Sequence, residues 1–82
     1  MHYQIIFKPR AFNDGEKLPE QMRARIFEKI TLLENDLTGN VKHLTDFFPE
    51  YRLRVGDYRV LFEIEGDRVV VYRIRHRKDV YR

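Results

Sequence analysis

The order of the β-strands in this chain is predicted by one stretch, residues 51–75, which reads YRLRVGDYRVLFEIEGDRVVVYRIR. It contains three runs rich in aromatic and aliphatic side chains, and glycine-containing turns separate them. Such runs are typical of β-strands, and the lack of a helical segment between them predicts an antiparallel meander. The expected strands are Tyr51–Val55, Tyr58–Glu65 and Val69–Arg75.

The first hairpin of the meander also predicts which side chains share a face of the sheet. With Gly56-Asp57 as a two-residue turn, Val55 lies opposite Tyr58, and alternate residues of the two strands form one apolar face. The expected members of this core face are Tyr51, Leu53, Val55, Tyr58, Val60, Phe62 and Ile64. Arg52, Arg54 and Arg59 then point to the opposite face.

The second hairpin has two possible registers, which differ in where Arg73 and Arg75 point. A two-residue loop would bury both arginines in the core, where the desolvation of two charges is costly. We therefore expect the three-residue loop Gly66-Asp67-Arg68, which places both arginines beside Arg59. This register puts three other residues of the strand on the core face, Val70, Tyr72 and Ile74.

Upstream of the meander, the pattern predicts a strand, a long helix and a connector. Residues 3–7 alternate before Pro9, which indicates a strand. Between Arg10 and Lys17, signals for a short helix and for a turn compete. From Pro19 to Leu37 an amphipathic helix is expected, because apolar residues recur at three- and four-residue steps. These residues are Leu18, Met22, Ile26, Ile30, Leu33 and Leu37.

The connector is expected to span Val41 to Pro49, with Leu44, Phe47 and Phe48 closing one end of the core. Helical segments followed by strands predict a small single α+β domain covering residues 1–82. In this fold the N-terminal strand and one or two helices pack on an antiparallel sheet that ends in the three-strand meander.

Length and composition restrict the class of protein. A chain of 82 residues supports one hydrophobic core. It has no Cys, and its three histidines, His2, His43 and His76, are too scattered to suggest a metal site, so we expect neither metal nor cofactor. No segment resembles a signal peptide or approaches the roughly 20 apolar residues of a membrane span. We therefore expect a soluble cytoplasmic protein that does not bind membranes.

Positive charge is concentrated in the C-terminal part of the chain. Residues 1–50 carry seven Lys or Arg against eight Asp or Glu, whereas residues 51–82 carry nine against five. The nine are Arg52, Arg54, Arg59, Arg68, Arg73, Arg75, Arg77, Lys78 and Arg82. Guanidinium groups bind phosphate with paired donors, so a polyanionic partner is one interpretation. A solvated basic face, with arginines that shield the sheet, is the other, and the sequence favours neither.

The chain resembles the RelE/ParE superfamily of toxins. The resemblance rests on YRLRVGDYRVLF at residues 51–62, the apolar strand after it and the tail RHRKDVY at residues 75–81. The N-terminal strand, the helix and the connector also follow in the family's order. The resemblance implies a RelE-like fold and a toxin of a type II toxin–antitoxin system, which a cognate antitoxin protein neutralises. In the RelE branch such toxins enter the ribosomal A site and cleave mRNA, so it implies a metal-independent endoribonuclease.

The resemblance also implies a set of catalytic residues, which are Arg52, Arg54, Arg59, Arg75 and Tyr81. Arg59 and Arg75 suit stabilisation of the phosphate under attack, and Tyr81 suits base stacking or activation of the 2′-hydroxyl. Further expected contacts with RNA phosphates, beside Arg52 and Arg54, are Arg73, Arg77 and Lys78.

The general base of such a reaction stays open. The family often has lysine where this chain has Arg52 and Arg54, and arginine does not lose its proton in proteins. His76 and Glu50 are weaker candidates for acid or base, and strand parity assigns His76 to the core side as a structural residue.

Other functions remain open as well. The same fold could act by binding alone, either on DNA gyrase, as ParE-type toxins do, or as a nucleic-acid-binding module; both would need the arginines but not Tyr81. A third alternative is an inactive relative that binds only its antitoxin. The charge asymmetry predicts an acidic, amphipathic antitoxin segment over the arginine face or over the helix from Pro19 to Leu37.

Overall fold

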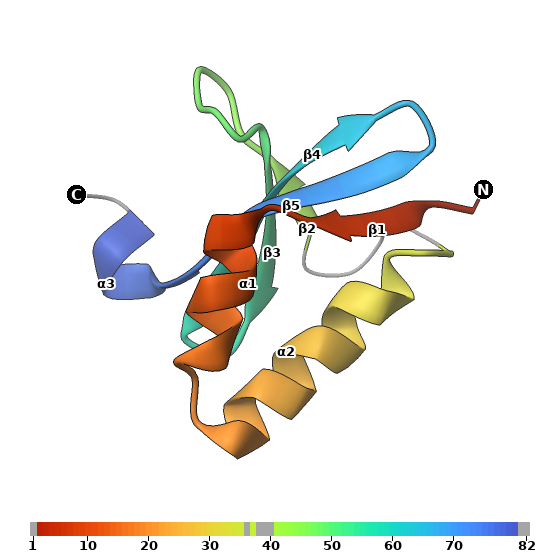
Figure 1. The fold of residues 1–82 in the computed structure, drawn as a ribbon. Coiled ribbons are helices and arrows are strands. Elements are labelled where there is room, and N and C mark those ends of the chain that lie inside the picture. Colours follow the sequence, from red (N-terminus) through yellow and green to blue (C-terminus); the bar gives the residue numbers. More distant parts are fainter. Residues whose placement is uncertain (1, 36, 38–40, 81–82) are drawn as a thin grey trace.

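The computed structural model describes residues 2–35, 37 and 41–80, and within them a sheet of five strands carries two helices on one face (Figure 1). The elements are β1 (Gln4–Phe7), α1 (Pro9–Glu16), α2 (Glu20–Leu32), β2 (Val41–His43), β3 (Tyr51–Val55), β4 (Tyr58–Glu65), β5 (Arg68–His76) and α3 (Arg77–Val80). The strand order is β1-β5-β4-β3-β2. The α+β prediction is confirmed, with one difference: the sheet is mixed, because β1 pairs with β5 in parallel.

The first hairpin has the expected register. Val55 pairs with Tyr58 and Leu53 with Val60 across the turn at Gly56-Asp57. Gly56 has a φ of 58°, and a glycine with positive φ at the first turn position is what type II′ hairpins require. The predicted core face is therefore confirmed for β3 and β4.

The second hairpin does not have the expected loop. Glu65 pairs with Arg68, so the turn is Gly66-Asp67, and the three-residue loop was wrong. The core cluster consequently contains Val69 and Val71 instead of Val70 and Tyr72, although Val70 is also buried.

A β-bulge in β5 reverses the alternation of side chains between Val71 and Arg73. The pairing shifts between Phe62, which faces Val71, and Leu61, which faces Arg73. Tyr72 is the extra residue of this bulge, and beyond it Ile74 enters the core opposite Val60. Because one inserted residue exchanges the two faces, the short turn places neither Arg73 nor Arg75 in the core.

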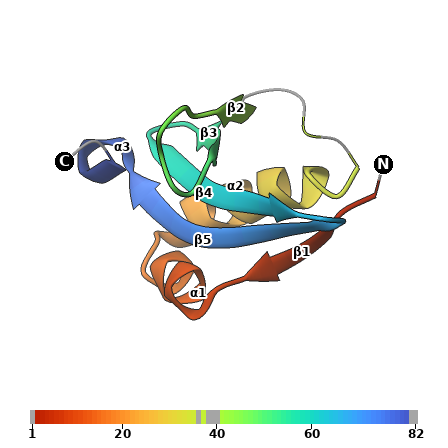
Figure 2. The same ribbon diagram turned by 90° about the horizontal axis from the view of Figure 1, so that it is seen from above.

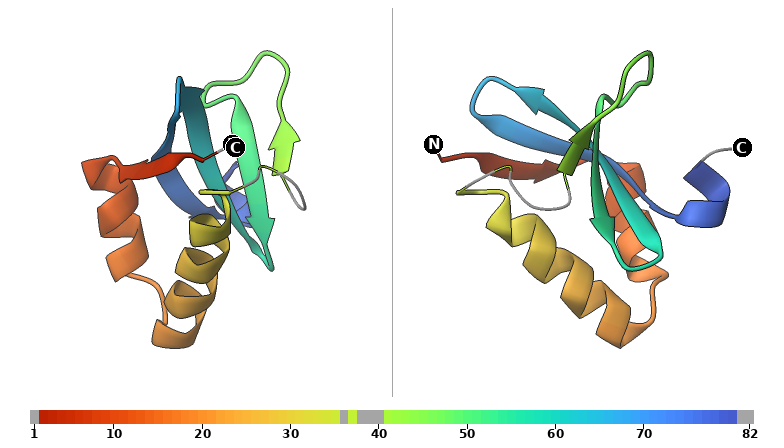
Figure 3. Two further views of the ribbon diagram at one scale, coloured as in Figure 1. Left: turned by 90° about the vertical axis from the view of Figure 1, so that its right-hand side faces the viewer. Right: turned by 180° about the vertical axis from the view of Figure 1, so that it is seen from behind.

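The two long helices cover the core face of the sheet. In the left view of Figure 3 they lie together on one side of the strands. They contribute Ala11, Ile26 and Ile30 to the buried cluster. The helices approach closely at Gly15, where an added Cβ would lie 3.0 Å from Cζ of Phe27. A side chain at this position would therefore push the helices apart.

The second helix is shorter than expected, because it ends at Leu32 instead of Leu37. Its last turn tightens, and the amides of Leu33 and Glu34 donate to carbonyls three residues earlier. The Glu34 carbonyl then accepts a 2.6 Å hydrogen bond from the Tyr3 amide, which fastens this end of the helix to the start of β1. Leu33 and Leu37 still pack against the core, but from outside the helix.

The predicted connector contains a strand, and part of the expectation for it was wrong. Val41–His43 form β2, which pairs antiparallel with β3 and extends the sheet. Phe47 and Phe48 are 52% and 69% exposed, so they do not close the core. Val41 packs on the core from β2 instead, and the loop 44–50 joins β2 to β3.

Helix α1 is attached to β5 through a single carboxylate. Because β1 ends opposite Val71, the following residues of β5 have a free edge there, and Asp14 accepts a 3.0 Å hydrogen bond from the Ile74 amide. Asp14 also accepts 2.7 Å and 3.2 Å bonds from the Arg73 guanidinium. Burial favours a raised pKa for Asp14, but these bonds and the charges of Arg73 and Arg75 outweigh it and lower the pKa.

Replacing Asp14 with Asn should reduce stability in a pH-dependent manner. A lowered folded-state pKa means that the carboxylate stabilises the fold above its unfolded pKa of about 3.9, and that this contribution disappears as the pH falls through the folded pKa. We expect Asp14→Asn to lower the free energy of unfolding by about 1–3 kcal/mol at neutral pH, with a smaller difference from wild type near pH 3. Urea denaturation at both pH values measures it.

Asp57→Asn is a suitable control, because Asp57 is exposed and lies 3.9 Å from Arg77 in a loose surface pair. It should change stability little at either pH. An equal loss for Asp14→Asn at both pH values would show that the carboxylate's charge contributes nothing.

Candidate functional site

Two rows of side chains, most of them basic, cross the sheet on the face opposite the helices. The first, called the arginine row here, consists of Arg54, Arg59 and Arg75, which pair across β3, β4 and β5. The second row consists of Lys42, Arg52, Leu61 and Arg73, from β2 to β5. Side chains alternate along each strand, so both rows lie on the non-core face. Lys42 was absent from the predicted site because β2 was not recognised in the sequence.

Arg59 is the centre of the arginine row and is only 8% exposed. Its Nη1 donates 3.0 Å hydrogen bonds to the carbonyls of Gly56 and Tyr58, so the hairpin turn holds the guanidinium. Its Nε is buried and has no hydrogen-bond partner among the described residues. A buried donor without a partner is costly, and an anion at this position would remove that cost.

The surroundings of Arg59 make the row electrostatically unfavourable in the absence of an anion. Burial lowers the pKa of Arg59, and the charges of Arg52, Arg54 and Arg77 lower it further, against the opposing effect of Asp57. Arginine nevertheless keeps its proton at neutral pH. Like charges placed opposite each other on neighbouring strands repel, so the row concentrates positive potential that suits a phosphate group.

Arg73 does not belong to this open cluster, although we expected it there. Its Nε lies 2.7 Å from Oδ2 of Asp14, and this hydrogen bond raises the pKa of Arg73. The side chain therefore joins α1 to the sheet, and its charge is compensated. The sequence contained no signal for this pair, because the two residues are far apart in the chain.

The C-terminal helix α3 begins beside the arginine row. The Arg77 amide donates a 2.7 Å hydrogen bond to the carbonyl of Asp57, which ties α3 to the β3–β4 turn. Lys78 is exposed on α3. Tyr81, which follows α3 in sequence, lies outside the described residues.

The two candidate acid–base residues are already engaged in structural contacts. The His76 ring packs edge-on against Tyr58, with ring centroids 5.3 Å apart, and its Nδ1 accepts a 3.2 Å hydrogen bond from the Lys78 amide. His76 thus lies on the core side, as strand parity predicted. Glu50 Oε2 lies 3.2 Å from Nε2 of His43.

Glu63, one of the carboxylates that β4 carries on the basic face, holds the neighbouring loop. It is buried, and both of its oxygens accept the Glu50 amide at 3.1–3.2 Å. The Glu63 carboxylate therefore anchors the loop 44–50. Among the described residues it has no hydrogen bond to the arginine row.

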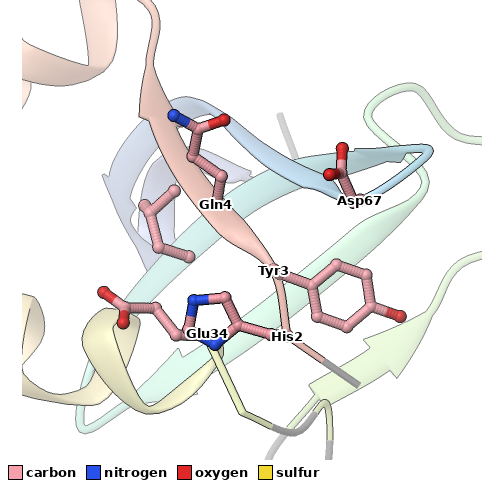
Figure 4. Close-up of a pocket in the computed structure, with 6 residues that line it drawn as sticks. His2, Tyr3, Gln4, Glu34 and Asp67 are labelled. Carbon is pink, nitrogen blue, oxygen red and sulfur yellow. The ribbon is translucent and has the colours of Figure 1, made fainter.

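A shallow pocket elsewhere on the molecule has no connection with these residues. It lies at the start of β1 and is lined by His2, Tyr3, Gln4, Ile5, Glu34 and Asp67 (Figure 4). None of the predicted site residues borders it. Across residues 2–35, 37 and 41–80 no group of three or more His, Asp or Glu side chains could hold a metal ion. In that same part of the chain, no helix has the length and apolar character needed to span a membrane.

Comparison with known proteins agrees with this fold. Residues 5–81 match the family model described as the ParE toxin of the type II toxin–antitoxin system parDE. The chain is 32% identical over 85 residues to Toxin RelE3 of Methanocaldococcus jannaschii, and the match covers 95% of this chain and 94% of that protein.

Two solved structures resemble the fold closely. One is the RelB–RelE antitoxin–toxin complex from Methanococcus jannaschii, with a TM-score of 0.78 and 30% identity over 93% of this chain and 94% of that one. The other is the toxin–antitoxin complex RelBE2 from Mycobacterium tuberculosis, with a TM-score of 0.80 and 27% identity over 93% of this chain and 99% of that one. The chain therefore belongs to the RelE/ParE superfamily and is a RelE-like toxin of a type II toxin–antitoxin system.

Proposed function

We propose that this toxin is a ribosome-dependent endoribonuclease that cleaves mRNA in the A site and so inhibits translation in the cytoplasm. The observation that carries the proposal is the arginine row, in which three arginines pair across neighbouring strands on the sheet face opposite the helices. Cleavage by attack of a 2′-hydroxyl on the adjacent phosphate needs positive donors around the phosphoryl oxygens. It needs no metal when side chains supply those donors.

The residues would divide the work according to their positions. Arg59, held by the turn, supplies a fixed positive charge and a buried N–H beneath the phosphate. Arg75 and Arg54 flank it and are more accessible, so they bind the phosphoryl oxygens directly. Arg52 and Lys42 of the second row, with Arg77 and Lys78 of α3, guide the strand on either side.

Tyr81 follows α3 directly, and α3 begins beside the row. From this position in the chain, we assign it the role that the family resemblance implies, stacking on a base or activation of the 2′-hydroxyl. His76 and Glu50 are less suitable as general base, because each is occupied by another group.

The protein partner of the toxin is proposed to be a cognate antitoxin. The two similar solved structures are toxin–antitoxin complexes, and the exposed basic face is complementary to an acidic peptide. A second candidate function is binding of DNA gyrase, which the ParE description of the matching family model favours. Arginines that serve binding alone would not need Tyr81.

Arg75→Ala should abolish most of the cleavage. Loss of one donor to a developing charge lowers turnover by roughly 10²–10³-fold in comparable sites. We would add the purified toxin to programmed ribosomes and map the mRNA ends. Arg68→Ala is the matched control, because Arg68 is exposed on the same strand but outside both rows, and it should cleave normally.

If expression arrests growth but the mRNA stays intact, the nuclease proposal is wrong and gyrase binding is the candidate function that fits. Absence of growth arrest on expression would leave only antitoxin binding as an activity.

Tyr81→Phe should separate catalysis from binding. The variant retains the ring but lacks the hydroxyl, so hydroxyl activation would be lost while stacking is kept. If the phenol acts in proton transfer, cleavage should fall roughly 10²-fold or more while affinity for the antitoxin is unchanged. If Phe cleaves normally and Ala does not, the ring acts by stacking. Normal cleavage by both variants would remove Tyr81 from the site.

A further inference from the structure

A pair of aromatic rings lies on the same face of the sheet as the arginine row, and the proposed chemistry does not use it. Phe48 is 69% exposed, and its ring centroid lies 5.2 Å from that of Tyr72 with the rings edge-to-face. Nζ of Lys8 lies 5.4 Å from the centroid of the Tyr72 ring. An exposed phenylalanine beside a second ring and a cation offers a π-surface in a positively charged setting.

Both rings are placed there by specific features of the fold. Tyr72 is the extra residue of the bulge in β5, next to Arg73 of the second row. Phe48 belongs to the loop 44–50, which passes over β4 in the view from above (Figure 2). The loop is closed by a 2.6 Å hydrogen bond from the Leu44 amide to the carbonyl of Glu50, and the buried Glu63 accepts the Glu50 amide. Phe48 is therefore presented by an anchored loop.

We propose that Phe48 and Tyr72 form a stacking site for one nucleobase of the single-stranded RNA whose phosphates lie along the arginine row. This inference rests on the proposed function and adds to it a second contact, away from the scissile phosphate. Aromatic side chains bind bases of any identity by stacking, and they are effective where basic side chains hold the adjoining backbone. Lys8 and the second row provide those cations here.

The spacing allows one strand to reach both places. Tyr72 and Arg75 are three positions apart on β5, which is about 10 Å at a strand rise of ~3.3 Å per residue. A nucleic-acid strand advances ~3.4 Å per nucleotide when stacked, so the stacked base lies about three nucleotides or fewer from the bound phosphate.

The hollow beside Phe48 gives the site a means of base preference. Its lining includes His43, Thr45 and Glu50, which carry hydrogen-bond donors and acceptors. Stacking holds the plane of a base, and polar groups at its edge distinguish one base from another.

The test compares Phe48→Ala, Phe48→Trp and Phe12→Ala by fluorescence anisotropy with a labelled single-stranded oligoribonucleotide and by cleavage on programmed ribosomes. Phe12→Ala is the control, because Phe12 is a similarly exposed ring, at 54%, and lies on α1, on the opposite face of the sheet. Phe48→Ala should bind RNA roughly 5- to 100-fold more weakly, Phe48→Trp should bind as wild type, and the salt dependence should be unchanged.

A set of RNAs with one abasic nucleotide at successive positions identifies the base. One abasic position should weaken wild type and have no further effect on Phe48→Ala, since the two changes remove the same contact. Equal affinity of Phe48→Ala and wild type, or additive effects at every abasic position, would overturn the stacking site. So would a loss confined to antitoxin binding, which would make the pair a protein-docking surface.

Failure of the proposed function gives a different result. If wild type cleaves no message but Phe48→Ala and the abasic RNA show the shared loss in binding, the nuclease is wrong and the base site stands. If Arg75→Ala loses cleavage while Phe48→Ala is normal in both assays, the nuclease stands and the base site is wrong.

Discussion

The bulge at Tyr72 is the constraint on which the rest of the structure depends. The short turn at Gly66-Asp67 aligns Val69 and Val71 with the core, and with uninterrupted alternation it would also bury Arg73 and Arg75. One extra residue reverses the alternation halfway along β5. The first half of the strand can then supply the centre of a small core while the second half supplies charge to the opposite face. A sheet of this size has few other ways of combining both requirements in its longest strand.

The end of β1 has a second consequence for the same strand. Beyond Val71, β5 has no neighbouring strand on that side, and its free amide at Ile74 is satisfied by Asp14 of α1. The Asp14 carboxylate also accepts hydrogen bonds from Arg73, which lies on the basic face of the same strand. One side chain thus satisfies a backbone donor, compensates a charge and fixes a helix. The arginine row is left with Arg54, Arg59 and Arg75, whose mutual repulsion is offset only in part, by Asp57 at Arg59 and by Asp14 at Arg75.

Sequence reasoning predicted those parts of the fold that depend on local patterns. Alternation and the Gly56-Asp57 turn were enough for the register of β3 and β4, and therefore for Arg54 opposite Arg59. The cost of burying charge correctly predicted that Arg75 lies outside the core. That prediction assumed a strand without a bulge, and the expected three-residue loop was therefore wrong. A bulge leaves no mark in the sequence when the extra residue, Tyr72, is an ordinary strand former. The pair Asp14–Arg73, the three-residue strand β2 and the outward Phe48 depend on tertiary contacts between distant segments, which single-sequence patterns do not encode.

The arginine row also lowers the stability of the domain that carries it. Burial and neighbouring charges both disfavour the charged form of Arg59, and its Nε is left without a partner in the described residues. A small domain has little stability to lose, so such an arrangement is expected where binding makes use of it. Any polyanion that occupies the row relieves the repulsion, whether it is an RNA backbone or an acidic antitoxin segment. Neutralisation by the antitoxin and catalysis on RNA would then draw on one electrostatic feature, and the two ligands would exclude each other because each is attracted by the same positive charge.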